Sequence, residues 1–212
     1  MDRSKIVEGI KKAKENSKKR NFTQSIDITI SLKEIDLNNP KNRINEELVL
    51  PHGKGKPVKI GVIADGDLAM KARDFTDMVI TKEKLKELQK NRRLCKEIAK
   101  KYDFFIAQAD MMPMVGKILG PVLGPRGKMA KPIPPTADLK PLFDRYSRTV
   151  RIKMKDQPVI SVPVGTEEMD DDKISENCEA VISAIERKLE KGSHHIKNIF
   201  IKTTMGAPIK VK

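Results

Sequence analysis

The sequence predicts a protein of combined α/β and α+β class, with two domains of which one is built from both ends of the chain. In residues 58–155, apolar strands alternate with helical patterns, which is typical of an α/β unit with a mostly parallel sheet. The flanking segments supply strands and amphipathic helices whose apolar faces stay uncovered unless the two segments pack together. We therefore expect a split α+β domain, 1–57 and 156–212, interrupted by a Rossmann-like α/β domain at 58–155.

The first half of the split domain begins with a basic helix at residues 3–19. A strand follows in which every second residue from Ile26 to Leu32 is apolar and the residues between are polar. This period of two predicts one buried and one solvent-facing side. A short strand, EELVL, ends at Pro51, and the stretch PHGKGKP at residues 51–57 has the composition of a linker.

The inserted domain opens with VKIGVIA, a near-continuous apolar run that is typical of a strand buried on both faces. Helical patterns follow at residues 66–73 and 81–101, and DFFIAQ predicts another buried strand. The Met-rich stretch from Met111 to Leu119 and the segment TADLKPLFDRYS predict further helices, and TVRIKM predicts a last strand.

The second half of the split domain follows a break at KDQP, residues 155–158. VISVPVG predicts a strand, and HIKNIFIKTT predicts another at the end of the chain. Between them lies a helix with a continuous apolar stripe, formed by Ile174, Cys178, Val181, Ile182, Ile185 and Leu189. With the helix at 3–19, this gives an antiparallel sheet covered by two helices. The Gly/Pro content of the two breaks predicts a hinge, at Gly53, Gly55, Pro57 and Pro158.

The charge of the chain favours a polyanionic partner. Lys and Arg number 43 against 29 Asp and Glu, which gives a net charge of +14 at pH 7. The excess is concentrated at both ends, because residues 1–20 are strongly basic and residues 196–212 carry four lysines and no acid. Aromatic residues make up only 4% of the chain and Trp is absent, which argues against recognition of many stacked bases.

Two cysteines and a lack of long apolar runs indicate a cytoplasmic protein. Cys95 and Cys178 are not spaced as metal ligands, and both fall on apolar faces of helical patterns, so we expect buried, reduced thiols. No apolar run approaches the ~20 residues of a membrane span, and the N-terminus lacks the apolar core of a signal peptide. We expect no membrane association and a monomer when free.

Motifs for catalysis, cofactors and metals are missing. The Gly/Pro/Lys stretch from Gly116 to Lys140 fails as a Walker loop, since Met129 follows Gly127-Lys128 and Val122 stands where the first glycine belongs. No G-x-G-x-x-G follows a strand, and the two carboxylates of ADGD are more typical of a solvated or capping turn than of a metal site. We predict no enzyme, no cofactor and no metal. A nucleotide-binding α/β protein remains an alternative.

The remaining hypothesis is binding of RNA. The polar side of the Ile26 strand, with Phe22, Thr23 and Gln24 before it, would lie beside the basic C-terminal strand. The segment KTTMGAP then offers hydroxyls, a flexible apolar side chain and a bare backbone at Gly206. Such groups suit RNA that is recognised through its shape and its 2′-hydroxyls. A protein–protein adaptor with basic ends remains a second alternative.

Four segments resemble one family. GKILGPVLGPRGKMAKP, LPHGKGK, NFTQSIDITISL and FIKTTMGAP are similar, in their order along the chain, to stretches of the large-subunit ribosomal protein L-one family. The short, basic form resembles the archaeal type. The resemblance implies a two-domain protein that binds an rRNA helix in the mobile stalk near the tRNA exit site, assists release of deacylated tRNA, and represses translation of its own mRNA.

The resemblance also assigns residues. Phe22, Ser25 and Asp27 match the N-terminal strand contacts, and Thr203 to Gly206 match the C-terminal RNA-contacting motif, although here Ala207 separates Gly206 from Pro208. The full set of expected RNA contacts is Phe22, Thr23, Gln24, Ser25, Asp27, Lys197, Asn198, Lys202, Thr203, Thr204, Met205 and Gly206. For Lys117, Arg126, Lys128 and Lys131, either a second RNA contact or a fold-maintaining loop with solvated charges is expected.

Overall fold

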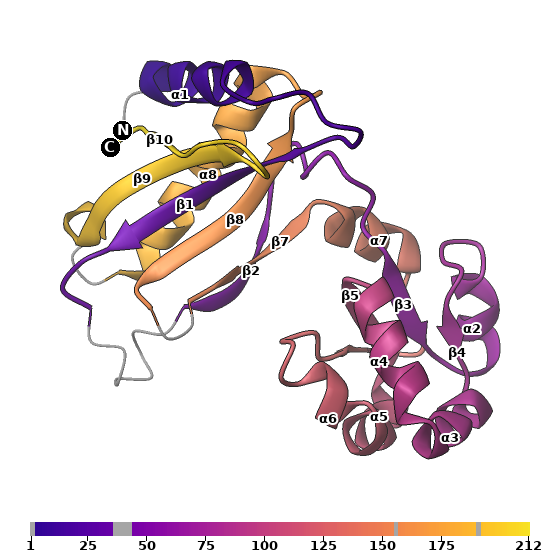
Figure 1. Ribbon diagram of the computed structural model, residues 1–212. Coiled ribbons are helices and arrows are strands. Elements are labelled where there is room, and N and C mark those ends of the chain that lie inside the picture. The colour runs from indigo at the N-terminus through magenta and orange to yellow at the C-terminus, as the bar shows by residue number, and fades with distance from the viewer. Residues whose placement is uncertain (1–2, 36–43, 155–156, 190–191) are drawn as a thin grey trace. The chain divides into compact units, whose positions relative to one another are not determined.

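The computed structural model of the chain describes residues 3–35, 44–154, 157–189 and 192–212 (Figure 1). The chain divides into two compact units: unit 1 comprises Met1–Lys56 and Arg148–Lys212, and unit 2 comprises Pro57–Ser147. Antiparallel and parallel sheets are both present, so the predicted mixed class is confirmed.

Unit 1 is built on an antiparallel sheet in the order β10-β9-β1-β8. Its strands are β1 (Ser25–Leu32), β8 (Val159–Thr166), β9 (Ile196–Thr203) and β10 (Ile209–Lys210). In β1, which lies between β8 and β9, burial alternates at every residue, as the hydrophobic pattern predicts. The sheet therefore has one apolar and one polar side.

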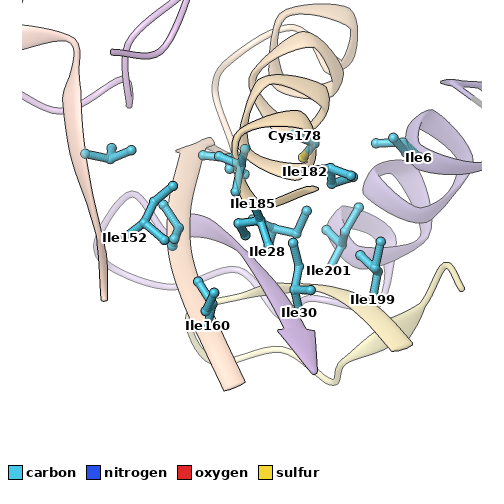
Figure 2. Packing of buried hydrophobic residues seen from close by; sticks show 14 of the residues in the cluster. Ile6, Ile28, Ile30, Ile152, Ile160, Cys178, Ile182, Ile185, Ile199 and Ile201 are labelled. Carbon is cyan, nitrogen blue, oxygen red and sulfur yellow. The ribbon is translucent and has the colours of Figure 1, made fainter. Parts of the chain in front are cut away.

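The apolar side is covered by helices α1 (Arg3–Glu15) and α8 (Asp171–Lys188) (Figure 1). Figure 2 shows Ile28 and Ile201 of the sheet in the same cluster as Ile182 of α8 and Ile6 of α1. Cys178 is part of this core, and burial raises the pKa of its thiol to about 12, so the side chain behaves as a small apolar group. Cys95 is also buried, and neither cysteine forms a disulfide.

A second, two-stranded antiparallel sheet corrects the expected boundary at 155. Strand β7 (Thr149–Lys153) pairs with β2 (Asn45–Val49), and its apolar residues Val150 and Ile152 join the core of unit 1. Residues 148–154 thus belong to unit 1, because their partners come from the N-terminal half of the chain. Residues 155 and 156 of the expected second break lie outside the described residues.

Unit 2 contains a parallel sheet in the order β4-β3-β5-β6. The strands are β3 (Ile60–Ile63), β4 (Val79–Ile80), β5 (Phe104–Gln108) and β6 (Lys131–Ile133). Two separate apolar clusters form around it, one with α2 (Gly66–Ala72) and α7 (Leu139–Ser147), the other with α3 (Lys82–Lys90) and α5 (Met112–Ile118). All four residues of β3 are buried, as its apolar run predicts.

The helical pattern expected at 81–101 forms two helices. Asn91 ends α3, and its side-chain Oδ1 accepts a hydrogen bond from the amide of Leu94 at 3.3 Å, which begins α4 (Arg92–Lys101). Asparagine favours such caps over helix interiors, so the local preference overrides the continuous pattern. The Gly116–Lys140 stretch contains the short α6 (Gly120–Leu123) and all of β6.

Asn177 of α8 joins three segments of unit 1. Its Nδ2 donates to the carbonyl oxygens of Gly53 and Val164, both at 2.8 Å, and its Oδ1 accepts from the amide of His52 at 3.1 Å. Val164 is the extra residue of a bulge in β8, since Ile26 pairs with Gly165 and Asp27 with Pro163. Asn177 is fully buried, so it satisfies backbone groups that β pairing leaves free.

We predict that Asn177→Ala lowers the free energy of unfolding by about 3 kcal/mol, because the buried carbonyl and amide groups lose their partners. Urea unfolding of the full chain measures this change. The exposed amide variant Gln89→Ala on α3 is the control and should change stability by less than about 0.5 kcal/mol. A loss in Asn177→Ala no larger than in the control would contradict the proposed junction.

Candidate nucleic-acid interface

The polar side of the unit 1 sheet carries hydroxyls, a carboxylate and an ammonium group. Ser25, Asp27, Thr29 and Ser31 of β1 are half-buried there. Lys202 lies opposite Asp27 on β9, and Ser161 of β8 lies opposite Thr29, with their hydroxyl oxygens 3.1 Å apart. These groups present donors and acceptors along two neighbouring strand pairs.

A bulge in β9 sets the positions of Lys197 and Asn198. Ser31 pairs with Asn198 and Leu32 pairs with Ile196, so Lys197 is the extra residue between them. Lys197 is exposed, and Asn198 is half-buried on the polar side beside Ser31. The bulge therefore lets adjacent residues 197 and 198 both reach solvent, which strict alternation would not allow.

One end of the sheet is held by the buried side chain of Gln24, just before β1. Its Nε2 donates to the Ser17 Oγ at 2.8 Å, and its Oε1 accepts from the backbone amide of Met205 at 3.2 Å. The backbone amide of Gln24 in turn donates to a carboxylate oxygen of Glu167 at 3.0 Å. Gln24 thus ties the end of α1 and the segment after β8 to the turn after β9.

Thr203, the last residue of β9, is also fully buried beneath that turn. Its hydroxyl donates to Ser17 Oγ at 3.0 Å, and the amide of Gly206 donates to the Thr203 carbonyl oxygen at 3.2 Å. A Cβ added to Gly206 would lie 2.3 Å from the Thr203 Oγ1. Only glycine permits so close an approach at position 206.

The exposed rim of this turn is apolar and hydroxyl-bearing. Met205 is 61% exposed and Phe22 is 50% exposed, which is unusual for side chains of this size. Thr204 Oγ1 accepts a hydrogen bond from the amide of Ser25 at 3.1 Å, and the Thr204 amide donates to the carbonyl oxygen of Ser25. The backbone around Met205 is therefore fixed, while its side chain projects freely.

The carboxyl group of Asp27 on this surface is affected by burial and by neighbouring charges. Partial burial raises the pKa of its carboxyl group above the ordinary value of 3.8, and the charges of Lys202 and Lys56 oppose that shift. Ionised Asp27 is therefore a cost to the free protein, and a neighbouring 2′-hydroxyl or amide donor would relieve it.

The structure separates the expected contacts into two groups. Phe22, Thr23, Ser25, Asp27, Lys197, Asn198, Lys202, Thr204, Met205 and Gly206 reach the surface of unit 1 along the polar side or its end. Gln24 and Thr203 are fully buried and hold the turn instead. Ser17, Glu167 and Asn177 were missed by sequence reasoning, because no motif marks a polar residue whose partners are distant in the chain.

The four basic residues of the Gly/Pro/Lys stretch lie in unit 2. Lys128 Nζ donates to the carbonyl oxygens of Ala99 and Tyr102 at 3.1 and 2.6 Å, and Arg126 Nη1 donates to that of Lys96 at 3.2 Å. These bonds satisfy the carboxyl end of α4, which favours the fold-maintaining interpretation for both side chains. Lys131 Nζ lies 5.9 Å from the centre of the Tyr146 ring, and Lys117 is exposed on α5.

Of the four residues expected to form the hinge, three lie within unit 1 and one begins unit 2. Gly53 and Gly55 have positive φ angles of 66° and 72°, and a Cβ on Gly55 would lie 2.7 Å from the Met169 sulfur. Both glycines are thus held within unit 1, and Pro57 begins unit 2. Pro158 lies inside unit 1, where its carbonyl oxygen accepts from the amide of Leu32, so it is not at a boundary between units.

Within the described ranges, no group of three or more His, Cys, Asp or Glu side chains is arranged to hold a metal ion. None of the helices described here has the length and apolar character needed to cross a bilayer. The fold and the charge define the class: a basic protein of two units, one with an antiparallel sheet built from both ends of the chain and one with a parallel sheet.

Comparison with known proteins identifies the family. Residues 11–207 match the model of the ribosomal protein L1p/L10e family. The chain is 54% identical over 207 residues to the large ribosomal subunit protein uL1 of Methanothermobacter thermautotrophicus, which covers 97% of this chain and 98% of that protein. It is 51% identical to the protein of the same name from Methanocaldococcus jannaschii and 50% identical to that from Thermococcus kodakarensis, each over the whole chain and 97% and 98% of the relative.

The chain therefore belongs to the ribosomal protein L1p/L10e family, and the predicted archaeal type is confirmed. It is a structural component of the large ribosomal subunit, located with the ribosome in the cytoplasm, and not an enzyme.

We predict that Gly206→Ala destabilises the chain by about 1–3 kcal/mol, because the new Cβ must displace the Thr203 hydroxyl or the turn. Thr203→Ala alone costs about 1–2 kcal/mol through its lost hydrogen bond and methyl contacts. In the double variant the clash is gone, so the combined loss should be smaller than the sum, with a coupling of about 1 kcal/mol. Additive losses in urea unfolding would show that the two residues do not contact.

The raised pKa of Asp27 predicts a pH dependence with a defined sign. A carboxyl group with a raised pKa in the folded state contributes stability at low pH, and this contribution is lost as pH rises through the raised value. Asp27→Asn should therefore gain stability relative to the parent chain as pH increases from 3.8 through the raised pKa. Parallel urea unfolding series over this range measure the difference, with Asp67→Asn on α2 as the control for loss of one charge. If the stability of Asp27→Asn relative to the parent chain fell as pH increased, the raised pKa of Asp27 would be contradicted.

Proposed function

We propose that the polar side of the unit 1 sheet and the rim formed by Phe22, Thr204, Met205 and Gly206 bind a stalk helix of the large-subunit rRNA. The main support for this proposal is the fixed turn at residues 203–206. The turn exposes the side chain of Met205 and the backbone at Gly206, and it is held by the fully buried side chains of Gln24 and Thr203. Preorganised contacts of this kind add affinity because little entropy is lost on binding.

The chemistry of the surface supports RNA as the ligand. Hydroxyls of Ser25, Thr29 and Thr204 can exchange hydrogen bonds with 2′-hydroxyls and base edges, which distinguishes RNA from DNA. Lys197 and Lys202 supply phosphate contacts, which give affinity but no sequence discrimination. Membership of a family of large-subunit proteins supplies the rRNA as the source of this ligand.

We also propose two finer roles, which the family resemblance implies. On the ribosome the bound chain would form the mobile stalk near the tRNA exit site and assist release of deacylated tRNA. A similar structure in its own mRNA would occupy the same surface, so the free chain would repress its own translation. In cell-free translation, added chain should lower synthesis from its own message, and an excess of the stalk rRNA fragment should restore it, because the two RNAs compete for one surface.

We predict that Met205→Ala weakens binding to the stalk rRNA fragment by roughly tenfold, or about 1.4 kcal/mol, through loss of apolar contact area. The same substitution should hardly change binding to a scrambled hairpin, which is held mainly through phosphates. Filter binding across a salt series measures both constants.

Met70→Ala is a matched control, since Met70 is 69% exposed but lies on α2 of unit 2. It should bind both RNAs as the parent chain does. Equal losses on the stalk fragment and the scrambled hairpin would remove Met205 from the specificity surface, and no loss on either would remove it from the interface.

A further inference from the structure

Unit 2 contains a cavity lined partly by aromatic residues, and this cavity is separate from the surface of unit 1 proposed to bind rRNA. The cavity has a volume of about 250 Å³ and is lined by Val58, Lys59, Ile60, Arg73, Asp74, Phe75, Thr76, Asp77, Tyr102 and Phe143. It lies between the start of β3, the α2–β4 connection and α7. Sites for drug-sized ligands measure roughly 300–1,000 Å³, so this cavity suits a smaller, flat group.

Its aromatic wall is stacked and exposed. The rings of Phe75 and Phe143 have centroids 5.4 Å apart and an interplanar angle of 29°, yet Phe75 remains 44% exposed. Contact with Phe143 from a separate element fixes the orientation of the Phe75 ring. An exposed ring held in this way can accept a nucleobase with little loss of side-chain entropy.

The segment that carries Phe75 is anchored on both sides. Thr76 Oγ1 donates to the carbonyl oxygen of Ile60 at 2.5 Å and accepts from the amide of Met78 at 3.3 Å. The amides of Phe75 and Thr76 donate to the carbonyl oxygen of Ala72, which ends α2. The ring therefore sits on fixed backbone rather than on a loose loop.

The rim of the cavity holds opposite charges that are not paired with one another. Lys59, Arg73, Asp74 and Asp77 all line it, and among the described residues no ion pair joins these side chains to a partner. Ionised carboxylates only accept hydrogen bonds, and guanine presents two adjacent donors, N1–H and the 2-amino group, on its Watson–Crick edge. Adenine, cytosine and uracil each lack that pair. The cations can meet the neighbouring phosphates.

We propose that this cavity binds an unpaired guanine of an RNA strand, stacked on Phe75, with Asp74 or Asp77 accepting from its Watson–Crick edge and Arg73 and Lys59 facing its phosphates. It is a second RNA site, in a different unit from the surface proposed for the stalk helix. It recognises a single exposed base, in keeping with a chain that has few aromatic residues.

Labelled heptauridylate and three relatives with a central guanosine, adenosine or cytidine test the proposal by fluorescence anisotropy with the full chain. The guanosine strand should bind about tenfold more tightly than the other three, as expected for one stacked and hydrogen-bonded base. Equal affinities for all four strands would overturn the proposal and leave only non-specific attraction to a basic protein.

Substitutions locate the site. Phe75→Leu should abolish the guanosine preference because it removes the flat ring, whereas Phe75→Tyr keeps a ring at this position and should retain the preference. Asp74→Asn combined with Asp77→Asn should equalise guanosine and adenosine. Leu94→Ala is the matched control, since Leu94 is a similarly exposed apolar side chain of unit 2 that does not line the cavity, and it should leave the guanosine preference unchanged. A preference that survives Phe75→Leu, or is lost in Leu94→Ala, would overturn the assignment to this cavity.

Discussion

The surface of unit 1 depends on a small polar junction in which the half-buried Ser17 Oγ accepts hydrogen bonds from the buried side chains of Gln24 and Thr203. Ser17 follows α1, Gln24 precedes β1 and Thr203 ends β9, so three distant segments meet at one point. Buried polar groups stabilise a fold only when all are satisfied, and here the free Gln24 oxygen accepts from the Met205 amide. The position of the exposed turn is thereby set largely by the side chains of Gln24 and Thr203, which are fully buried.

The rest of the polar sheet side follows from simple strand geometry combined with two irregularities. Strict alternation turns Ile26, Ile28 and Ile30 toward the helices and leaves hydroxyls and Asp27 outward. The bulge at Val164 is closed by Asn177, and the bulge at Lys197 adds a cation to the polar side. Each irregularity interrupts β pairing, and in the first of them a side chain from α8 supplies the missing hydrogen bond. Binding chemistry and fold stability are thus carried by neighbouring but different residues.

Much of the fold could be predicted because its patterns are local. The period of two in β1 and the apolar stripe of α8 predicted their burial, and the alternation of strands and helices predicted the parallel sheet of unit 2. The sequence did not predict features that depend on distant residues or on helix caps. Strand β7 belongs to unit 1 because it pairs with β2, which lies about a hundred residues earlier in the chain. Asn91 divides a continuous helical pattern into two helices. Gln24 and Thr203 were expected to contact RNA, but both side chains are fully buried. Nothing in a sequence shows that a polar side chain has buried partners. The aromatic cavity of unit 2 had no sequence signal, since Phe75 and Phe143 are far apart in the chain.

Hydroxyl-radical footprinting of the full chain with and without the stalk rRNA fragment, read out by mass spectrometry, directly tests whether this surface of unit 1 contacts the RNA. Met205 and Phe22 are exposed and oxidise readily when free, and Met70 is a similarly exposed reference in unit 2. We expect that the RNA protects Met205 and Phe22 and leaves the oxidation of Met70 unchanged. Bound RNA that leaves Met205 and Phe22 as reactive as in the free chain would contradict the assignment of this surface.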